Sequence, residues 1–153
     1  MAVNVRFFRN AAILYEAQGL APSTPGSAGT DLRACLMEGD FLVIPAGERR
    51  PVPSGIAVEP TVPGVAGFVY SRSGLGAVKG LTVAQGVGVI DPDYRGEIIV
   101  FLLNTSKEDY TVKNGERIAQ LVFHSCARPV FSPVDTLGET DRGAGGFGHT
   151  GAG

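Results

Sequence analysis

Short apolar segments recur along the chain and are separated by residues that favour turns. Alternating apolar positions begin with Val3, Val5 and Phe7, and apolar segments follow at Phe41–Ile44, Gly55–Val58, Val65–Tyr70, Leu81–Val83, Val87–Ile90, Glu97–Leu103, Tyr110–Val112, Arg117–Phe123 and Pro129–Val134. Strands that recur every ~8–12 residues are typical of sandwiches, barrels and jelly rolls. The pattern predicts an all-β domain. Its most apolar stretch, Glu97–Leu103, should be a central and well-buried strand.

Turn-forming residues divide these segments. Residues 22–30 predict a loop, Asp91 to Gly96 predicts a tight turn, and Asn114-Gly115 predicts a hairpin turn. Only Ser73–Val78 is suited to a short helix, with Ser71 or Ser73 as its N-terminal cap.

Composition supports a single β-rich domain and excludes several classes of protein. The 153 residues suit one domain, and 22 Gly with 10 Pro disfavour a helical bundle. A net charge of −2 gives no basic field that would attract nucleic acid, and no apolar run approaches the ~18 residues of a membrane span. Two cysteines are too few for a disulfide framework, so a cytoplasmic location is expected.

The C-terminal segment differs from the rest of the chain. Six of the eleven residues from 143 to 153 are glycine. Glycine loses the most conformational entropy on ordering, so we expect a β domain over residues 1–140 followed by a flexible arm over 141–153. Arg142, Phe147 and His149 in this arm suggest a segment that orders on a ligand.

Two constellations combine polar side chains with turns. Arg72 and Ser73 precede the predicted helix and could bind a phosphate together with helix amides, although a capped helix with one solvated arginine fits the same residues. Asp91 could act as a general base at the edge of a hairpin, although Asp91 and Asp93 could equally be ordinary turn formers.

Two further constellations are equally ambiguous when each is taken alone. Gln120 could donate an amide hydrogen bond into a pocket or simply point outward from a strand. Arg142 and Phe147 could form a flap that binds phosphate and stacks on a planar ring, or they could belong to a disordered tail. His124 and His149 do not have the spacing of a metal site, and motifs for a covalent nucleophile are absent from the sequence.

Taken in order, these segments resemble the five motifs of the trimeric deoxyuridine triphosphate nucleotidohydrolase (dUTPase) family. The matching stretches are Ala28-Gly29-Thr30-Asp31-Leu32-Arg33-Ala34, Arg72-Ser73-Gly74-Leu75, Gly88-Val89-Ile90-Asp91 with Tyr94-Arg95-Gly96, Gly115-Glu116-Arg117-Ile118-Ala119-Gln120, and Arg142-Gly143 to Thr150-Gly151. The resemblance implies a jelly-roll-like subunit with one short helix and a homotrimer with C-terminal arm exchange. It also implies Mg²⁺-dependent hydrolysis of dUTP to dUMP and pyrophosphate, which limits uracil in DNA and supplies dUMP for thymidylate synthesis.

The resemblance also assigns residue roles. Asp91 occupies the position of the general base that activates a water for in-line attack on the α-phosphorus. Mg²⁺ would have no direct protein ligand, and Asp31 would reach it at most through water. The residues that would bind substrate are Arg72, Ser73, Gly74, Gln85, Gly88, Val89, Ile90, Tyr94, Gln120, Arg142, Phe147, Gly148, His149 and Thr150.

Selectivity would come from the segment between Gly86 and Ile90 and from Tyr94. A backbone that pairs with the N3–H and O4 of uracil leaves unpaired groups against cytosine, at about 1–3 kcal/mol for each buried group. Tyr94 matches the family tyrosine that packs against C2′ of the sugar and excludes a 2′-hydroxyl. Ser71, Gln85 and His149 depart from residues that are common in the family, and the role of Gln85 in recognising the base is open.

Two other functions remain compatible with such a scaffold. A dCTP deaminase would share the fold, but it needs a glutamate base near the cytosine amine, where this chain has Gln85. A bifunctional enzyme would combine the two reactions. A nucleotide-sensing or protein-binding module could lose the base or the arm, and both are present here.

Overall fold

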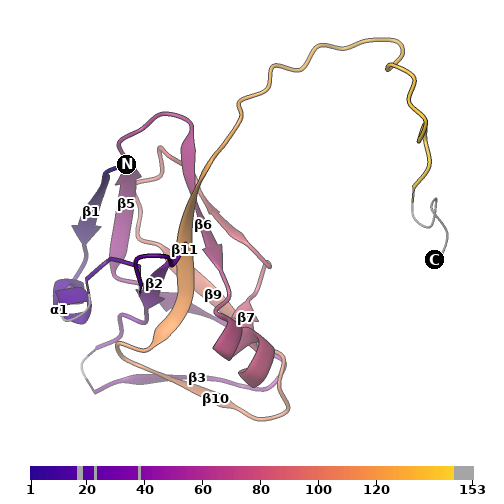
Figure 1. Cartoon of the computed structure of the whole chain (residues 1–153). Coiled ribbons are helices and arrows are strands. Elements are labelled where there is room, and N and C mark those ends of the chain that lie inside the picture. Colours follow the sequence, from indigo (N-terminus) through magenta and orange to yellow (C-terminus); the bar gives the residue numbers. More distant parts are fainter. Residues whose placement is uncertain (17–18, 23, 38, 147–153) are drawn as a thin grey trace.

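Antiparallel strands form four small sheets in the computed structural model, which describes residues 1–16, 19–22, 24–37 and 39–146 (Figure 1). The strands are β1 (Val3–Phe7), β2 (Thr30–Arg33), β3 (Phe41–Ile44), β4 (Arg49–Pro53), β5 (Ile56–Pro60), β6 (Val65–Tyr70), β7 (Leu81–Val83), β8 (Gly88–Ile90), β9 (Ile99–Asn104), β10 (Tyr110–Lys113) and β11 (Arg117–Ser125). Two short helical segments, α1 (Ala11–Glu16) and η1 (Gly74–Val78), interrupt them. The predicted all-β class is confirmed.

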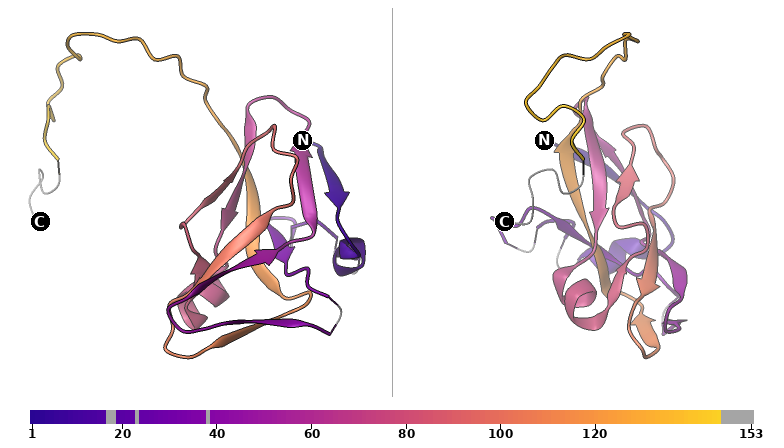
Figure 2. Two further views of the ribbon diagram at one scale, coloured as in Figure 1. Left: turned by 180° about the vertical axis from the view of Figure 1, so that it is seen from behind. Right: turned by 90° about the vertical axis from the view of Figure 1, so that its right-hand side faces the viewer.

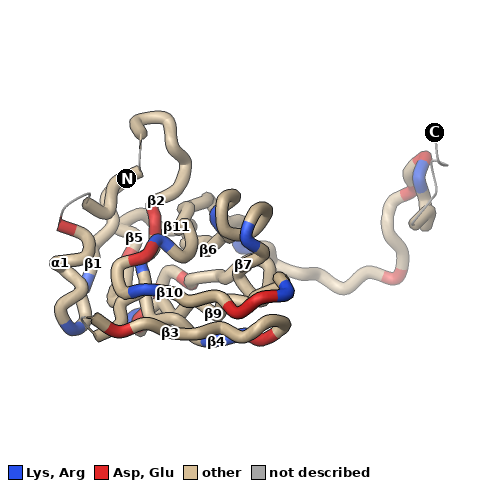
Figure 3. The backbone as a smooth tube through the Cα atoms, turned by 90° about the horizontal axis from the view of Figure 1, so that it is seen from below, with Lys and Arg blue, Asp and Glu red and all other residues tan. Residues whose placement is uncertain are grey.

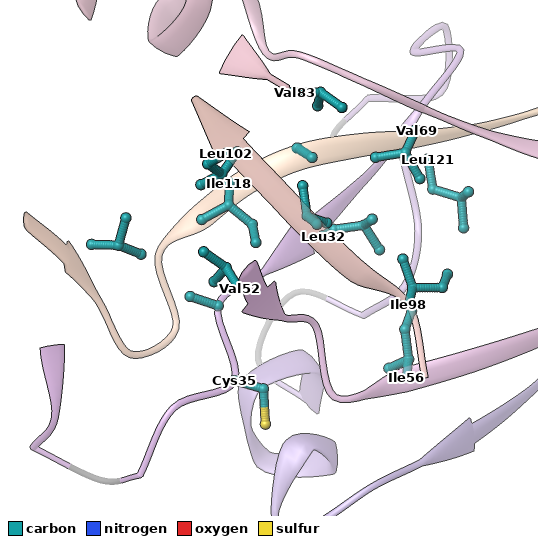
Figure 4. Packing of buried hydrophobic residues seen from close by; sticks show 14 of the residues in the cluster. Leu32, Cys35, Val52, Ile56, Val69, Val83, Ile98, Leu102, Ile118 and Leu121 are labelled. Atoms are coloured by element: carbon teal, nitrogen blue, oxygen red, sulfur yellow. The ribbon is translucent and has the colours of Figure 1, made fainter. Parts of the chain in front are cut away.

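Two sheets carry most of the core. A four-stranded sheet has the order β2-β11-β6-β8, and a three-stranded sheet has the order β4-β9-β7. Leu32, Val69 and Leu121 of the first sheet meet Val52 and Leu102 of the second in a shared apolar interior (Figure 4). The pairs β1-β5 and β10-β3 extend the structure on either side of this interior.

Strand β9 is central in its sheet but is buried on one face only. It pairs with β4 on one edge and with β7 on the other. Val100 and Leu102 are buried, whereas Ile99 and Phe101 are 40% and 44% exposed. The expectation of a central strand is therefore confirmed. The expectation that it is well buried holds for alternate residues, as the two-residue period of a strand requires.

The helices depart from the sequence prediction. Residues 11–16 form the helix α1, which the prediction of a single short helix missed. Its six residues are held mainly by tertiary packing, because Ala11 and Tyr15 are buried. Helix η1 lies within the predicted range, but the side chain of Ser73 makes no capping bond. Ser73 thus occupies the predicted N-cap position without a capping bond, whereas the Ser71 hydroxyl accepts a hydrogen bond from the Val83 amide at 2.8 Å and is not the cap.

Three strand predictions are also corrected. Strands β2 and β4 were not predicted, because Thr30–Arg33 borders a glycine-rich loop and Arg49–Pro53 contains two prolines. The predicted strand Pro129–Val134 is absent, and Val130 and Phe131 are 92% and 89% exposed. A strand needs a partner, and this segment leads away from both main sheets (Figure 2).

The predicted turn at Asn114-Gly115 is present, but the predicted hairpin is wrong, because the strands on either side of the turn belong to different sheets. After the turn at Asn114-Gly115, β10 pairs with β3, while β11 pairs with β2 and β6. Gly115 has a φ of +78°, and Asn114 Oδ1 accepts the Leu36 amide at 3.0 Å, so the turn is tied to a neighbouring loop. Likewise, β7 pairs with β9 and β8 pairs with β6. Both turns therefore carry the chain from one sheet to another.

Charged residues are interspersed on the body of the molecule. In Figure 3, basic and acidic positions alternate over the sheets and the connecting loops. This arrangement agrees with a net charge of −2 and leaves local groups of charges as the candidates for ligand binding.

Candidate functional site

A cleft of about 250 Å³ contains the predicted base and most of the predicted nucleoside contacts. Its lining residues are Val69, Val83, Gln85, Gly88, Val89, Ile90, Asp91, Tyr94, Glu97, Ile98, Ile99 and Val100. Six of the predicted site residues therefore line one cleft: Gln85, Gly88, Val89, Ile90, Asp91 and Tyr94. The Asp91 side chain follows directly after β8 and is exposed at this cleft.

Glycines let the backbone of β8 line the cleft. Gly86 has a φ of +80°, which turns the chain after β7 toward β8. A Cβ on Gly88 would lie 3.2 Å from Gln85 Nε2 and 3.3 Å from Val69 Cβ. Gly88 therefore leaves space between Gln85 and β6, and the polar backbone groups of β8 stay close to the cleft.

Hydrogen bonds brace the loop from Asp91 to Glu97. The Tyr94 hydroxyl donates to the Glu97 carbonyl at 3.0 Å. A Cβ on Gly96 would collide with the Tyr94 ring, so only glycine allows the ring to take this position. Arg95 Nη2 donates to Glu59 Oε1 at 2.6 Å. The pKa of Glu59 is lowered by a hydrogen bond from Asn4 and by the charge of Arg95.

Arg72 belongs to a second group of charges. Its Nε donates to Asp31 Oδ1 at 2.7 Å, and Arg117 Nη1 donates to Asp31 Oδ2 at 3.1 Å. The Asp31 side chain is 18% exposed and thus bridges two guanidinium groups. We refer to Asp31, Arg72 and Arg117 as the arginine cluster. A guanidinium has five N–H groups, so these contacts leave Arg72 further donors for an anion.

The other predicted phosphate ligands lie beside this cluster. Gln120 Nε2 donates to the Ser71 carbonyl at 3.2 Å, which contradicts a purely outward polar residue. Ser73 and Gly74 are exposed at the start of η1. Gln120 is paired with Asp31 of β2 on one edge of β11 and with Tyr70 of β6 on the other. The register thus aligns these positions in one row across the sheet.

Asp91 and the arginine cluster lie toward opposite ends of β6, while Val69 and Gly88 of the cleft lie beside the Tyr70 row. Ile90 is opposite Gly67, whereas Gln120 is opposite Tyr70, three residues further along β6. At about 3.3 Å per residue these two rows are ~10 Å apart. Beyond them, Asp91 continues past the first row and Arg72 continues past the second. One chain therefore does not bring Asp91 and Arg72 together.

The C-terminal arm contributes no described residue to either group. Arg142 lies in the extended segment and donates from Nε to the Gly145 carbonyl at 2.9 Å (Figure 1). Phe147, Gly148, His149 and Thr150 lie outside the described residues. Their predicted roles stay predictions.

Sequence reasoning missed the roles of Arg117 and Glu97. Arg117 lies inside a recognised motif, but its spacing gave no sign that it contacts Asp31 across the sheet. Glu97 directly follows another motif and lines the cleft, where it forms an ion pair with Arg9. The hydrogen bond that Arg9 donates to Glu97 raises the pKa of Arg9. A partner 88 residues away could not be found from local sequence pattern.

Within the described ranges, the side chains of His, Cys, Asp and Glu form no group of three that could hold a metal ion. Asp31 is a single carboxylate already engaged by two arginines, which fits an indirect contact with a metal better than direct ligation. No helix in the described part of the chain is long and apolar enough to span a membrane.

Fold and site define an all-β protein with a nucleoside-sized cleft, whose exposed carboxylate is separate from an arginine cluster suited to phosphate. Residues 16–151 match the family model for dUTPase. The deoxyuridine 5'-triphosphate nucleotidohydrolase of Desulfitobacterium hafniense is 50% identical over 129 residues, which cover 84% of each chain. This chain belongs to the dUTPase family.

Solved structures agree on the jelly-roll-like fold. A mutant of the Staphylococcus bacteriophage 80alpha dUTPase with dUpNHpp superposes with a TM-score of 0.83 at 21% identity, covering 99% of both chains. A mutant dUTPase from phage phi11 of S. aureus, described with a coordinated structural Mg(II) ion, gives a TM-score of 0.76 at 19% identity and covers 91% of this chain and 100% of the other. At these identities the likeness establishes the fold.

Proposed function

We propose that the protein hydrolyses dUTP to dUMP and pyrophosphate. The observation that carries the proposal is the cleft where Asp91, Tyr94 and the backbone of β8 meet. The relative from Desulfitobacterium hafniense, which is 50% identical, is named a deoxyuridine 5'-triphosphate nucleotidohydrolase. The reaction would limit uracil in DNA and supply dUMP for thymidylate synthesis.

Asp91 is the proposed general base. An exposed carboxylate at the edge of the cleft can accept a proton from a water, and the resulting hydroxide attacks the α-phosphorus. The bond from the α-phosphorus to the bridging oxygen breaks, and pyrophosphate leaves. Arg72, Ser73, Gly74 and Gln120 bind phosphate oxygens and orient the chain of phosphates for this attack.

The cleft is suited to uracil and deoxyribose. The backbone from Gly86 to Ile90 offers amide and carbonyl groups to the base, and the Tyr94 ring closes the position of C2′. Glu97 is the other carboxylate in the cleft, but Arg9 and the Gly55 amide engage it. This pairing disfavours Glu97 as the base of a dCTP deaminase, because a base must be available to the substrate.

We further propose a homotrimer in which neighbouring chains complete each site. The separation of Asp91 from Arg72 along β6 supports this assembly, since a triphosphate must contact both. Arm exchange over residues 141–153 would bring Arg142 to the phosphates and Phe147 over the base, with Gly148, His149 and Thr150 beside them. The exposure of Val130, Phe131 and Leu137 also fits a segment that packs on another chain.

Mg²⁺ is the proposed cofactor and would neutralise charge on the phosphate oxygens when bound. The distribution of charges fits a cation held by the phosphates, with Asp31 in contact through water. The related phage phi11 structure is described with a structural Mg(II) ion. The net charge of −2 favours a small-molecule substrate over nucleic acid. A cytoplasmic location stays a prediction.

The test is pyrophosphate release from dUTP, dCTP, dTTP and UTP with Mg²⁺. We expect rapid release from dUTP alone, without ammonia release from dCTP. Equal use of all four nucleotides, or deamination of dCTP, would overturn the proposal. Tight binding of dUTP without turnover would instead indicate a nucleotide-sensing module.

A further inference from the structure

Arg9 makes a contact that the proposed reaction does not use. It lies between β1 and α1, and its guanidinium forms an ion pair with the carboxylate of Glu97. Arg9 has a φ of +52°, the one positive value among the non-glycine residues that the structure describes. A side chain disfavours this backbone conformation, so tertiary contacts must maintain it.

The same carboxylate oxygen of Glu97 that contacts Arg9 is also anchored by the loop before β5. Glu97 Oε1 accepts the Gly55 amide at 2.7 Å, and the Glu97 side chain is 14% exposed. Gly55 has a φ of +76°, and a Cβ there would collide with Ala11 and Cys35. The anchor is therefore closely packed, and Arg9 supplies the positive charge that this largely buried carboxylate needs.

The backbone of Glu97 controls the Tyr94 side chain. The Glu97 carbonyl accepts the Tyr94 hydroxyl at 3.0 Å, and the next residue, Ile98, donates its amide to the Ile56 carbonyl at 2.9 Å. The Tyr94 ring therefore has its orientation fixed by residues that are fixed in turn by Arg9 and Gly55. Both Tyr94 and Glu97 line the cleft.

We propose that Arg9 is a positioning residue for sugar selectivity, which acts through Glu97 to hold the Tyr94 ring against C2′ of the nucleotide. This inference rests on the proposed function. Removing Arg9 leaves the Glu97 carboxylate with one fewer donor, so the segment around Glu97 relaxes and its carbonyl moves. The Tyr94 ring then packs less closely against C2′, and a nucleotide with a 2′-hydroxyl binds more easily.

The experiment compares dUTP and UTP in the Arg9→Met, Arg9→Lys and Arg50→Met variants. Arg50 also forms an ion pair, with Glu48, but this pair is exposed at the start of β4 and serves as a matched control. We expect Arg9→Met to raise the ratio of kcat/KM for UTP to that for dUTP by about tenfold, with kcat for dUTP changed less than about threefold. Arg9→Lys should recover part of the selectivity, and Arg50→Met should match the wild type.

The Tyr94→Phe variant tests the same link when Arg9→Met folds poorly. It removes the hydroxyl that contacts the Glu97 carbonyl, and it should raise relative UTP use by a similar factor. The double variant should add little to either single change, since both act on one ring. The inference would be overturned if Arg9→Met lowered the Tm but left the ratio of kcat/KM for UTP to that for dUTP unchanged. The same unchanged ratio in Tyr94→Phe would also overturn it. A wild-type protein that does not hydrolyse dUTP would overturn the proposed function instead.

Discussion

Strand β8 determines the position of Asp91, whereas an ion pair with Asp31 determines the position of Arg72. Asp91 directly follows β8 at a position where the side chain is exposed to the cleft. Arg72 is held by Asp31, which Arg117 holds as well. The residue types at both sites were predictable from sequence, but the bridging carboxylate and Arg117 were not, because they meet across a sheet.

Asp91→Asn should separate binding from chemistry. The amide keeps the shape of the carboxylate but cannot accept the proton of the attacking water, so we expect kcat to fall by about 10²–10⁴. Affinity for a non-hydrolysable dUTP analogue should change only a few-fold. Single-turnover kinetics and calorimetric titration measure the two quantities. A kcat within a few-fold of the wild type would show that Asp91 is not the base.

Tyr15 links α1 to the core through a buried hydroxyl. It donates to the Ser54 carbonyl at 2.8 Å and accepts the Arg33 amide at 3.0 Å. Burial raises its pKa to about 12. The folded pKa exceeds the unfolded value of about 10, so the contribution to stability is full below pH ~10 and is lost as pH rises through ~12.

Unfolding by urea at several pH values measures this loss. The free energy of unfolding should fall between pH ~10 and ~12 by up to about 1.4 kcal/mol per pH unit for this group. Tyr15→Phe should lower stability by about 1–3 kcal/mol at neutral pH and flatten part of the alkaline slope. If the free energy of unfolding of Tyr15→Phe fell with pH as steeply as that of the wild type, the titration would belong to other groups. Tyr110 is one such group, because burial also raises its pKa to about 12.

At the scale of elements, strand existence was more predictable than strand partners. Val65–Tyr70 and Phe41–Ile44 are apolar runs, and each forms a strand with the predicted bounds. Strand β4 escaped prediction because its prolines are tolerated where they need no ladder donor. Residues 11–16 follow Asn10, a residue preferred at helix N-termini, but six residues are too few to show a helical period and depend on packing by Ala11 and Tyr15.

The end of β9 is joined to its surroundings by one buried amide. Asn104 Nδ2 donates to the Ile44 carbonyl at 2.9 Å and to the Glu108 carbonyl at 2.8 Å, while Oδ1 accepts the Ser106 amide at 3.0 Å. Asn104 thereby ties β9 to β3 and closes the loop that leads to β10. Its side chain is fully buried.

Asn104→Ala should therefore destabilise the junction of these elements. It leaves two carbonyls and one amide without their partner, and we expect a loss of about 3 kcal/mol in the free energy of unfolding. Thr105→Val, which removes an exposed hydroxyl that donates to the Gly80 carbonyl, is a matched control with a smaller expected loss. Denaturant unfolding compares the two. Equal losses would mean that burial of the amide does not matter.

At the scale of the whole molecule, the extended segment after β11 has little contact with its own body (Figures 1 and 2). Its apolar residues Val130, Phe131 and Leu137 are at least 87% exposed. Sequence composition anticipated an arm, but the described part of the chain does not cover these apolar residues. In the proposed homotrimer, a neighbouring subunit would supply the surface on which they pack.

Deletion of residues 141–153 should leave folding and assembly intact while turnover falls severely. The deleted residues add no buried side chain to the two main sheets within the described part of the chain, so the Tm should change little. Light scattering measures assembly, and pyrophosphate release measures turnover. Full activity of the shortened protein would exclude a catalytic role for the arm.

The distance along β6 between Asp91 and the arginine cluster has a genetic consequence when sites are shared between chains, as proposed. A subunit lacking the Asp91 carboxylate would disable one pocket, while its arginines would still complete the pocket of a neighbour, so activity would fall in proportion to its share of the chains. Conversely, an Asp91→Asn chain mixed with an Arg72→Ala chain could rebuild some complete pockets from two inactive parents. Co-expression of the two mutant genes would reveal this complementation as recovered pyrophosphate release.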